Sequence, residues 1–281
     1  MEVQRRTTRL LVLAASSLLL ACEAGEERGD EPLGGGGGAV SRGAALPAVV
    51  AAWPDGSELV RLGGQPPRPE TEGPAPFAVG RRTKPAGTPV PVAGAEHALA
   101  VVALADRRTA WVRDRGGLGD LVLDDGRGAW TIDTEVLPEL AVSPDGSRLL
   151  YARRTVRGCE LVLAEPARGA REVVYAGPTA DRPVFRDDGA AFAFFGTGDG
   201  GFASLFVGAP GARPRQVTNV GLRTGHGLPF GFVPPASTAD GMTFAAAAGG
   251  SAAGGKVRYQ SPRGWCEVDA ATGAASCGGA P

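Results

Sequence analysis

Apolar and polar positions alternate in short runs along most of the chain, and tight turns divide the runs. The clearest example lies around Leu140, where the sequence reads LAVSPDGSRLLYARR. Two apolar segments flank a Pro-Asp-Gly turn there, and Asp-Gly between apolar runs is the strongest short-range signal for a β-hairpin. After residue 22, no long segment has the 3.6-residue period of a helix. The pattern therefore predicts an all-β fold.

The sequence of strand, Asp-containing turn and strand repeats along the chain, and each repeat continues into an outer hairpin. The five repeat units begin near Pro47, His97, Leu137, Arg182 and Leu228. Repeats with a period of roughly 40–50 residues are typical of β-propellers, and one propeller blade contains four strands. We therefore expect a β-propeller of about five four-stranded blades. The loops Gly63–Val79 and Gly227–Ala239 leave room for a sixth.

Asp and Gly have defined roles in the predicted turns. An Asp carboxylate can cap its own turn, and Gly supplies the positive φ. We assign this structural role to the Asp and Gly pairs Asp55-Gly56, Asp145-Gly146, Asp188-Gly189 and Asp240-Gly241. Unit two lacks the Gly. The inner strands, such as Phe192 to Phe195, are apolar on both faces, as expected for strands packed between two neighbouring blades.

The core of the repeat resembles that of TolB-like propellers, a family that includes periplasmic TolB and the propellers of prolyl-oligopeptidase-type enzymes. The segment Ser143-Pro144-Asp145-Gly146-Ser147-Arg148-Leu149 matches this core. Pro183-Val184-Phe185-Arg186-Asp187-Asp188-Gly189 is similar, with Arg-Asp in place of Ser-Pro. Arg215 to Asn219 looks like the polar strand end that precedes the next repeat. The resemblance, carried mainly by units three and four, implies a propeller. Family members typically have six or more blades, so the number stays open.

The first residues have the composition of a secretory signal. Three Arg residues within the first nine precede an uncharged run of 12 residues, Leu10 to Ala21, whereas a membrane-spanning helix needs about 20. The run ends in Leu19-Leu20-Ala21-Cys22, which resembles the lipobox of bacterial lipoproteins. That resemblance implies cleavage before Cys22 and several acyl chains on this residue, enough for a stable membrane anchor. The alternative is an ordinary signal peptide that contains a Cys.

The chain divides into a signal peptide (1–21), a lipidated Cys with a disordered tether (22–46) and a propeller domain (47–281). The tether is charged and then Gly-rich, so it has too little apolar surface to fold. Glu23 rather than Asp follows the Cys, which favours the outer membrane, facing the periplasm or the cell surface. Without residues 1–21 the chain keeps 26 basic and 29 acidic residues, so nothing indicates nucleic-acid binding.

The remaining cysteines fit an oxidising compartment. Cys266 and Cys277 flank a predicted hairpin that would place them opposite each other as a disulfide. Cys159 is either a small buried hydrophobic residue or the partner of one of these two. The chain has two His and no Cys-x-x-Cys spacing, so we expect no metal site and no cofactor.

Residues with catalytic potential do not combine into a set. His97 and His226 lie in different units. The Gly196–Gly201 stretch matches Gly-x-Gly-x-x-Gly, but a strand follows it where a dinucleotide site needs a helix, which favours a hairpin loop. The adjacent acids Asp124-Asp125 and Asp187-Asp188 occupy turns, which favours a structural role over glycosidase chemistry. With no nucleophile elbow in the sequence, we expect no enzymatic activity.

Two further residue classes could form binding surfaces. The four tryptophans, Trp53, Trp111, Trp130 and Trp265, lie in or beside strands, so we expect them to pack the blades. The arginines of unit three, Arg148, Arg153, Arg154 and Arg157, form either a patch for an acidic partner or a solvated face, and the second is favoured.

The anchor, tether and repeats together favour a cell-envelope lipoprotein whose propeller is a scaffold for binding. Its partner would be a protein, a peptide or a glycan, an expectation that rests on analogy of fold. Two alternatives stay open. One is a carbohydrate-active enzyme that uses carboxylates in the propeller channel, and the other is a purely structural envelope protein.

Overall fold

The computed structural model describes residues 48–64, 75–116, 118–223, 242–247, 254–261 and 264–279. All of them belong to the compact unit that begins at Leu46. Their regular structure is β-strand, apart from two short 3-10 turns, Ala105–Arg107 and Asp199–Gly201. The prediction of an all-β fold is confirmed. In the part of the chain that is described, no helix has the length and apolar character needed to cross a membrane.

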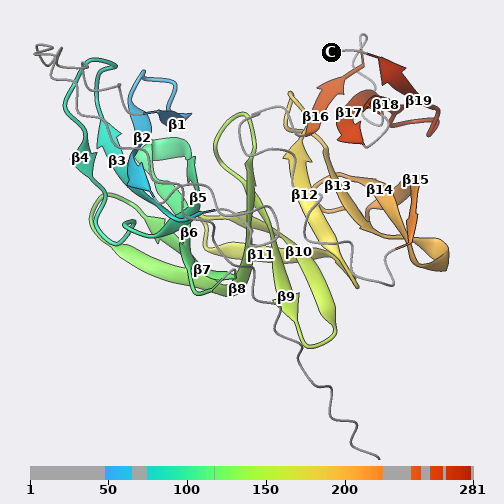
Figure 1. Cartoon of the computed structure of the whole chain (residues 1–281), viewed down its shortest axis with the longest axis horizontal. Helices are drawn as coiled ribbons and strands as arrows, with labels where there is room; N and C mark the ends of the chain where they lie inside the picture. The colour runs from blue at the N-terminus through green and yellow to red at the C-terminus, as the bar shows by residue number, and fades with distance from the viewer. Residues whose placement is uncertain are drawn as a thin grey trace, which may run out of the picture. The chain divides into compact units, whose positions relative to one another are not determined.

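The strands follow the order that the repeat units predict (Figure 1). The first group contains β1 (Val49–Ala52), β2 (Glu58–Gly64), β3 (Phe77–Arg82) and β4 (Val90–Pro91). The second contains β5 (Ala98–Ala103), β6 (Thr109–Asp114), β7 (Gly119–Asp124) and the first half of β8 (Ala129–Val142). The third contains the second half of β8, β9 (Leu149–Thr155), β10 (Gly158–Glu165) and β11 (Ala170–Gly177). The fourth contains β12 (Ala180–Phe185), β13 (Phe192–Thr197), β14 (Phe202–Gly208) and β15 (Arg215–Arg223). The fifth contains β16 (Met242–Ala246), β17 (Gly255–Ser261), β18 (Gly264–Asp269) and β19 (Ala275–Gly279).

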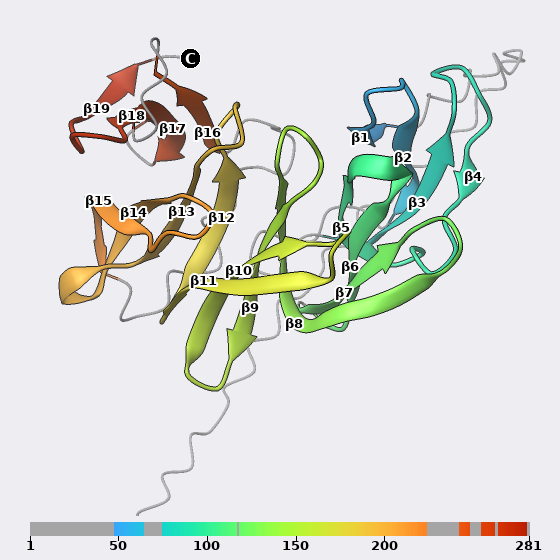
Figure 2. The same cartoon turned by 180° about the vertical axis from the view of Figure 1, so that it is seen from behind.

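Each group is an antiparallel meander in which consecutive strands pair. The fourth and fifth groups are separate four-stranded sheets, whereas the first three are joined into one ladder. The join between groups two and three is β8, whose first half pairs with β7 and whose second half pairs with β9. Figure 2 shows β8 passing from one group to the next. The repeat boundary near Leu137 is therefore a continuous strand and not a loop.

The centre of β8 is irregular where the repeat boundary falls. Its pairing with β9 shifts register between Val136 and Leu140, a segment that contains Pro138. Proline has no backbone N–H to donate to a ladder, so it is tolerated in a strand at such irregular positions. Glu135, just before the shift, has a positive φ of 58°. The strand thus changes partners at a local break in the ladder.

The inner strand β13 packs against both neighbouring groups, as its two apolar faces predict. Phe192 and Phe194 belong to a hydrophobic cluster shared with the third group. Ala193 and Phe195, on the other face, pack in a cluster shared with the fifth group. Because side chains alternate across a strand, one strand supplies the core on both of its sides.

The repeat turns, defined as the turns between the first and second strands of each group, also connect neighbouring groups. The indole Nε1 of Trp53 donates to the carbonyl of Leu104 at 2.8 Å. The N–H of Ala105 donates to the Gly146 carbonyl at 2.9 Å. Arg148 Nη2 then donates to the Gly189 carbonyl at 2.9 Å. The repeated sequence motif therefore builds the contacts between groups as well as the turn itself.

Within the turns, the predicted Asp residues accept local hydrogen bonds. Asp55 accepts from the N–H and hydroxyl of Ser57, and Asp145 does the same with Ser147. The Ser57 hydroxyl and N–H lower the pKa of Asp55 to about 2. The Ser143 hydroxyl, which also donates to Asp145, and then Ser147 lower the pKa of Asp145 to about 2. The following glycines, Gly56, Gly146 and Gly189, have φ values of 81°, 72° and 70°. Asp240 and Gly241 lie outside the described residues.

In unit two, Arg107 occupies the place of the glycine and takes a positive φ of 59°. Its guanidinium forms an ion pair with Asp55 of the preceding turn, at 2.7 Å. The residues proposed for a sixth blade are only partly described, since 65–74 and all of Gly227–Ala239 fall outside the described chain. The blade number stays a prediction.

Candidate functional site

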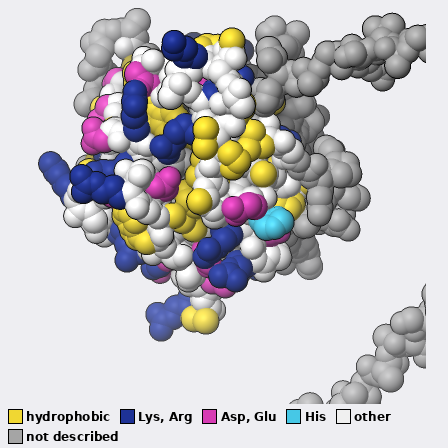
Figure 3. Space-filling view, turned by 90° about the vertical axis from the view of Figure 1, so that its left-hand side faces the viewer, with side chains coloured by type: hydrophobic (Ala, Val, Ile, Leu, Met, Phe, Trp, Pro, Cys, Tyr) yellow, Lys and Arg dark blue, Asp and Glu magenta, His cyan; other side chains and the backbone are white. Residues whose placement is uncertain are grey.

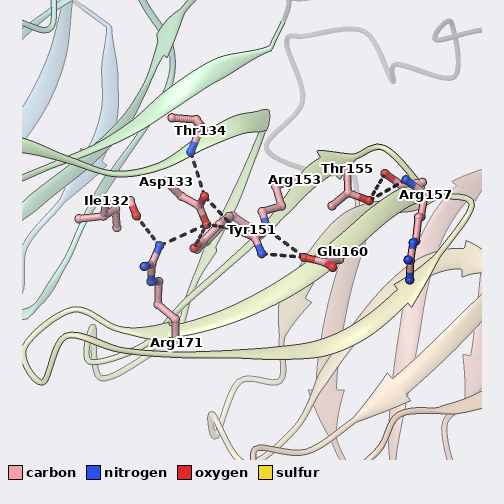
Figure 4. Close-up of polar contacts among 10 residues, drawn as sticks. Ile132, Asp133, Thr134, Tyr151, Arg153, Thr155, Arg157, Glu160 and Arg171 are labelled. Carbon is pink, nitrogen blue, oxygen red and sulfur yellow. Dashed lines mark hydrogen bonds and ion pairs between the residues drawn. The ribbon is translucent and has the colours of Figure 1, made fainter.

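A network of polar side chains surrounds Asp133 at the point where β8 leaves the second group (Figure 4). The Asp133 carboxylate, 8% exposed, accepts from the Tyr151 hydroxyl at 2.8 Å and from Arg153 Nη1 at 3.0 Å. Arg153 also pairs with Glu160 at 2.8 Å. Burial, followed by the hydrogen bond to Asp133, raises the pKa of Tyr151, so this hydroxyl stays a donor. The buried carboxylate is fully supplied with hydrogen bonds.

Arg171 connects this network to β11, the outermost strand of the third group. Its Nη1 donates to the carbonyl of Ile132 and lies 3.5 Å from Asp133 Oδ2. The guanidinium nevertheless stays 48% exposed. Arg171 therefore ties β11 to the first half of β8 while it presents a cation to solvent.

The first half of β8 leaves one backbone edge without a partner strand. Ala129 to Asp133 pair with β7, and among the described strands no other strand pairs with these residues. Trp130 on this edge strand is 45% exposed, and Val173 on β11 is 47% exposed. We call Trp130, Ile132, Arg171 and Val173 the β8 edge surface. It combines a free strand edge with exposed apolar and cationic side chains.

The prediction that the tryptophans pack the blades holds for Trp53 and Trp111, which are buried. It is wrong for Trp130. The residues around Trp130 form an edge strand whose side chains are mostly exposed, and the alternation of the sequence does not distinguish an edge strand from a covered one.

Other exposed apolar residues lie on the first group. Val90 on β4 is 67% exposed and Leu62 on β2 is 36% exposed. Figure 3 shows the side of the molecule on which β3 and β4 lie, and there hydrophobic side chains form small groups divided by charged ones. Single exposed apolar residues are normal on protein surfaces. Val90 is therefore a suitable control position for a substitution of Trp130.

Two acids meet between the third and fourth groups. Glu139, on the second half of β8, neighbours Asp181, on β12. Glu139 Oε2 also accepts the N–H of Arg182 at 2.8 Å. Burial, followed by the charge of Asp181, raises the pKa of Glu139 well above its usual value. An acid with a perturbed pKa, such as Glu139, is a candidate functional residue.

The adjacent acids named from the sequence have turn roles. Asp124 accepts from the Gly126 N–H, and Asp125 from the N–H groups of Arg127 and Gly128. Asp188 pairs with Arg186 at 2.8 Å. Asp187 Oδ1 accepts from the N–H of Ala246 in the fifth group.

The other sequence candidates also lie apart. The Gly196–Gly201 stretch is a short loop that leads into strand β14. His97 is exposed, and His226 lies outside the described residues. Arg148 is engaged by the Gly189 carbonyl and Arg153 by Asp133 and Glu160, so neither is a simple solvated cation.

The cysteines pair across the last hairpin. Cys266 on β18 and Cys277 on β19 are opposite each other in register and form a disulfide. Cys159 is a free, half-buried thiol, so the alternative pairings of Cys159 are wrong. Among the described residues, no three His, Cys, Asp or Glu side chains are placed to hold a metal ion.

Comparisons with known proteins bear on the fold alone. No family model matches the chain, and no curated protein sequence matches it. The structure is similar to that of dipeptidyl peptidase 4 from Porphyromonas gingivalis, with a TM-score of 0.51 and 11% identity. The chain has a β-propeller fold. The matched region covers 76% of this chain and 36% of the peptidase. We refer to each described four-stranded group as a blade, and the total number of blades stays a prediction.

Two further similarities are weaker. TolB from Acinetobacter baumannii aligns with a TM-score of 0.45 at 14% identity, over 74% of this chain and 49% of TolB, so the chain spans about half of that protein's length. A chain of a nidogen/laminin complex aligns with a TM-score of 0.47 at 10% identity, over 82% of this chain and 79% of that one. Similarities of this size carry no argument about activity or partners.

Proposed function

We propose that this chain is a lipid-anchored protein of the bacterial cell envelope whose propeller binds a protein partner through the β8 edge surface. The observation that carries the proposal is Trp130, exposed on a strand edge that has no partner strand in the described chain. Free strand edges pair readily with another chain, and Trp and Arg are enriched among residues that dominate binding energy. The lipid anchor in this proposal is inferred from the lipobox-like sequence that ends at Cys22.

The described residues give this surface the chemistry of a protein interface. An incoming strand would meet the unpaired edge of Ala129 to Asp133, where Arg171 already occupies the Ile132 carbonyl. Trp130 and Val173 would supply apolar contacts. Arg171 would present donors from beside the edge. Main-chain pairing gives affinity in this mode of recognition, and side chains give specificity. A catalytic role is not part of the proposal.

The anchor is tested by replacing Cys22. In a diderm bacterial host that expresses the full chain, we expect the wild type to take up a clickable fatty acid and to sediment with membranes. Cys22→Ala should lose nearly all of the label and appear in the soluble periplasmic fraction, because the thioether bond needs the sulfur. Cys159→Ala is the control and should keep the label. Equal labelling of Cys22→Ala and the wild type would contradict the anchor.

The binding surface is tested by replacing Trp130. We expect chemical cross-linking in native envelopes, followed by quantitative mass spectrometry, to recover a protein partner with the wild type. Trp130→Ala should lower its recovery by about tenfold or more, because an exposed Trp at the centre of an interface typically contributes 2 kcal/mol or more. Val90→Ala, at a more exposed apolar position on the first blade, should change nothing. Full recovery with Trp130→Ala would refute this surface.

A further inference from the structure

The hairpin between β9 and β10 ends in an apolar side chain that is fully exposed. Thr155 pairs with Gly158 across the hairpin, so Val156 and Arg157 form its two-residue turn. The exposed fraction of Val156 is 104%. Figure 1 shows this hairpin extending downward past the neighbouring strands. Val156 is therefore placed to meet a flat surface ahead of the strands around it.

Local contacts fix the conformation of this tip. The Thr155 hydroxyl accepts the N–H of Arg157 and donates to the carbonyl of Gly158, both at 3.2 Å. Gly158 has a positive φ of 132°, and a Cβ at this position would lie 3.1 Å from the Cα of Pro178. Pro178, in the connection between β11 and β12, is exposed as well. The tip thus rests on a second exposed apolar residue.

Two cations flank Val156. Arg154 and Arg157 are both exposed, and the Arg157 side chain points away from the polar network of the third blade (Figure 4). Glu160, the first acid of β10, is engaged by Arg153 at 2.8 Å. The positive charge of the tip therefore comes from Arg154 and Arg157. Cationic groups around an apolar side chain are the composition of elements that lie in a membrane interface.

The fold sets the direction in which the tip points. The repeat turns of consecutive blades are hydrogen-bonded to one another, so they lie on one side of the domain. β9 starts at its repeat turn and, at about 3.3 Å per residue, ends roughly 20 Å from it. β1 runs toward its own repeat turn, so the chain joins the domain from the side that carries the hairpin. An anchor ahead of β1 would leave this side facing the membrane.

The equivalent hairpins of the second and fourth blades differ from this one. In the second blade, Arg115 is paired with Asp120 at 2.8 Å. In the fourth, the loop between β13 and β14 exposes Asp199, which an anionic surface would repel. A contact with such a surface is therefore expected at the third blade.

We propose that the hairpin of β9 and β10 contacts the surface of a membrane that contains anionic phospholipid. Arg154 and Arg157 lie at the headgroups, and Val156 enters the boundary between headgroups and acyl chains. Arginines near an anionic leaflet and apolar side chains at this depth both favour the contact. A contact this small needs a domain that is already held close, as a tether does by raising the effective concentration. The inference rests on the proposed anchor for this closeness and does not involve the β8 edge surface.

The test holds the domain close by other means, so that it does not depend on acylation of Cys22. The chain from residue 22 onward, with Cys22→Ala and Cys159→Ala, carries an N-terminal hexahistidine tag and is bound to vesicles that contain a nickel-chelating lipid. These changes at the N-terminus lie outside the compact unit that begins at Leu46. Val156→Cys carries a nitrobenzoxadiazole fluorophore, whose emission rises and shifts to the blue when it leaves water.

On vesicles of equimolar phosphatidylglycerol and phosphatidylcholine we expect the blue-shifted emission, and on phosphatidylcholine alone an aqueous spectrum. Arg154→Gln combined with Arg157→Gln should lower the ratio of inserted to aqueous label about 25-fold, because each arginine near an anionic surface contributes about fivefold. Ala167→Cys with the same fluorophore is the matched control. Ala167 is exposed in the hairpin at the other end of β10 and should stay aqueous on both kinds of vesicle.

Three results would overturn the proposal. The first is an aqueous spectrum of labelled Val156→Cys on the vesicles with phosphatidylglycerol. The second is an equal blue shift of labelled Ala167→Cys, and the third is a double arginine variant that keeps the full response. Because the nickel-chelating lipid holds every variant at the vesicle, these results are separate from the fatty-acid labelling of Cys22. A failed anchor and a failed hairpin contact can therefore be told apart.

Discussion

Replacing Arg186 by alanine is expected to lower the free energy of unfolding by about 3 kcal/mol, since it removes a large buried side chain and leaves a buried carbonyl without its donor. Arg186 is 2% exposed. Its Nη1 donates to the Gly254 carbonyl at 2.7 Å, and its guanidinium lies 5.8 Å from the centre of the Phe244 ring. This residue replaces the Ser of the repeat core, and its side chain reaches from the fourth blade into the fifth.

The measurement is urea unfolding of the mature chain with its disulfide oxidised. Arg168→Ala is the matched control, because Arg168 is 79% exposed and surface substitutions usually change stability by less than about 0.5 kcal/mol. If Arg186→Ala unfolds at the same urea concentration as Arg168→Ala, Arg186 does not hold the two blades together.

Replacing Phe194 by alanine is expected to cost about 3–5 kcal/mol of unfolding free energy, the usual range for a fully buried phenylalanine. Its ring stacks on Phe206 with centres 5.3 Å apart and meets the edge of Tyr175 at 4.9 Å. These contacts fill the interface between the third and fourth blades. Thermal and urea unfolding should both show the loss.

Phe195→Ala provides the comparison, because the same change is made on the same strand but on its other face. Phe195 is half-buried and meets the edge of the Tyr259 ring at 5.0 Å. Less of its side chain leaves water on folding, so its loss should cost about half as much as that of Phe194. Equal costs would mean that the two faces of β13 do not differ in packing as described.

The sequence predicts the strands and turns well because their causes are local. An Asp carboxylate caps the turn two residues on, and a glycine supplies the positive φ, so SPDGS can be interpreted without knowledge of the rest of the chain. The same holds for β13, whose unbroken apolar run requires cover on both faces. The hairpin that joins Cys266 to Cys277 follows from the same local logic.

The acid pair could not be predicted, because its cause is not local. Glu139 and Asp181 meet only through the packing of one blade on the next, and no spacing rule relates them. A weak signal exists in the single acid within the apolar run LPELAV. The exposure of Trp130 could not be predicted from the sequence for a similar reason, because it depends on which strand lies at the edge of a sheet. Tertiary arrangement decides both features.

The continuity of β8 has a consequence for how this domain could have evolved. At the other two described boundaries, 92–97 and 178–179, a repeat unit ends in a turn or loop, where a duplication, deletion or insertion would leave the neighbouring ladders intact. Units two and three have no such point between them, because the last strand of one is the first strand of the other. An insertion there would cut two ladders at once. A gain or loss of blades on either side of this pair would disturb fewer ladders than one between its two members.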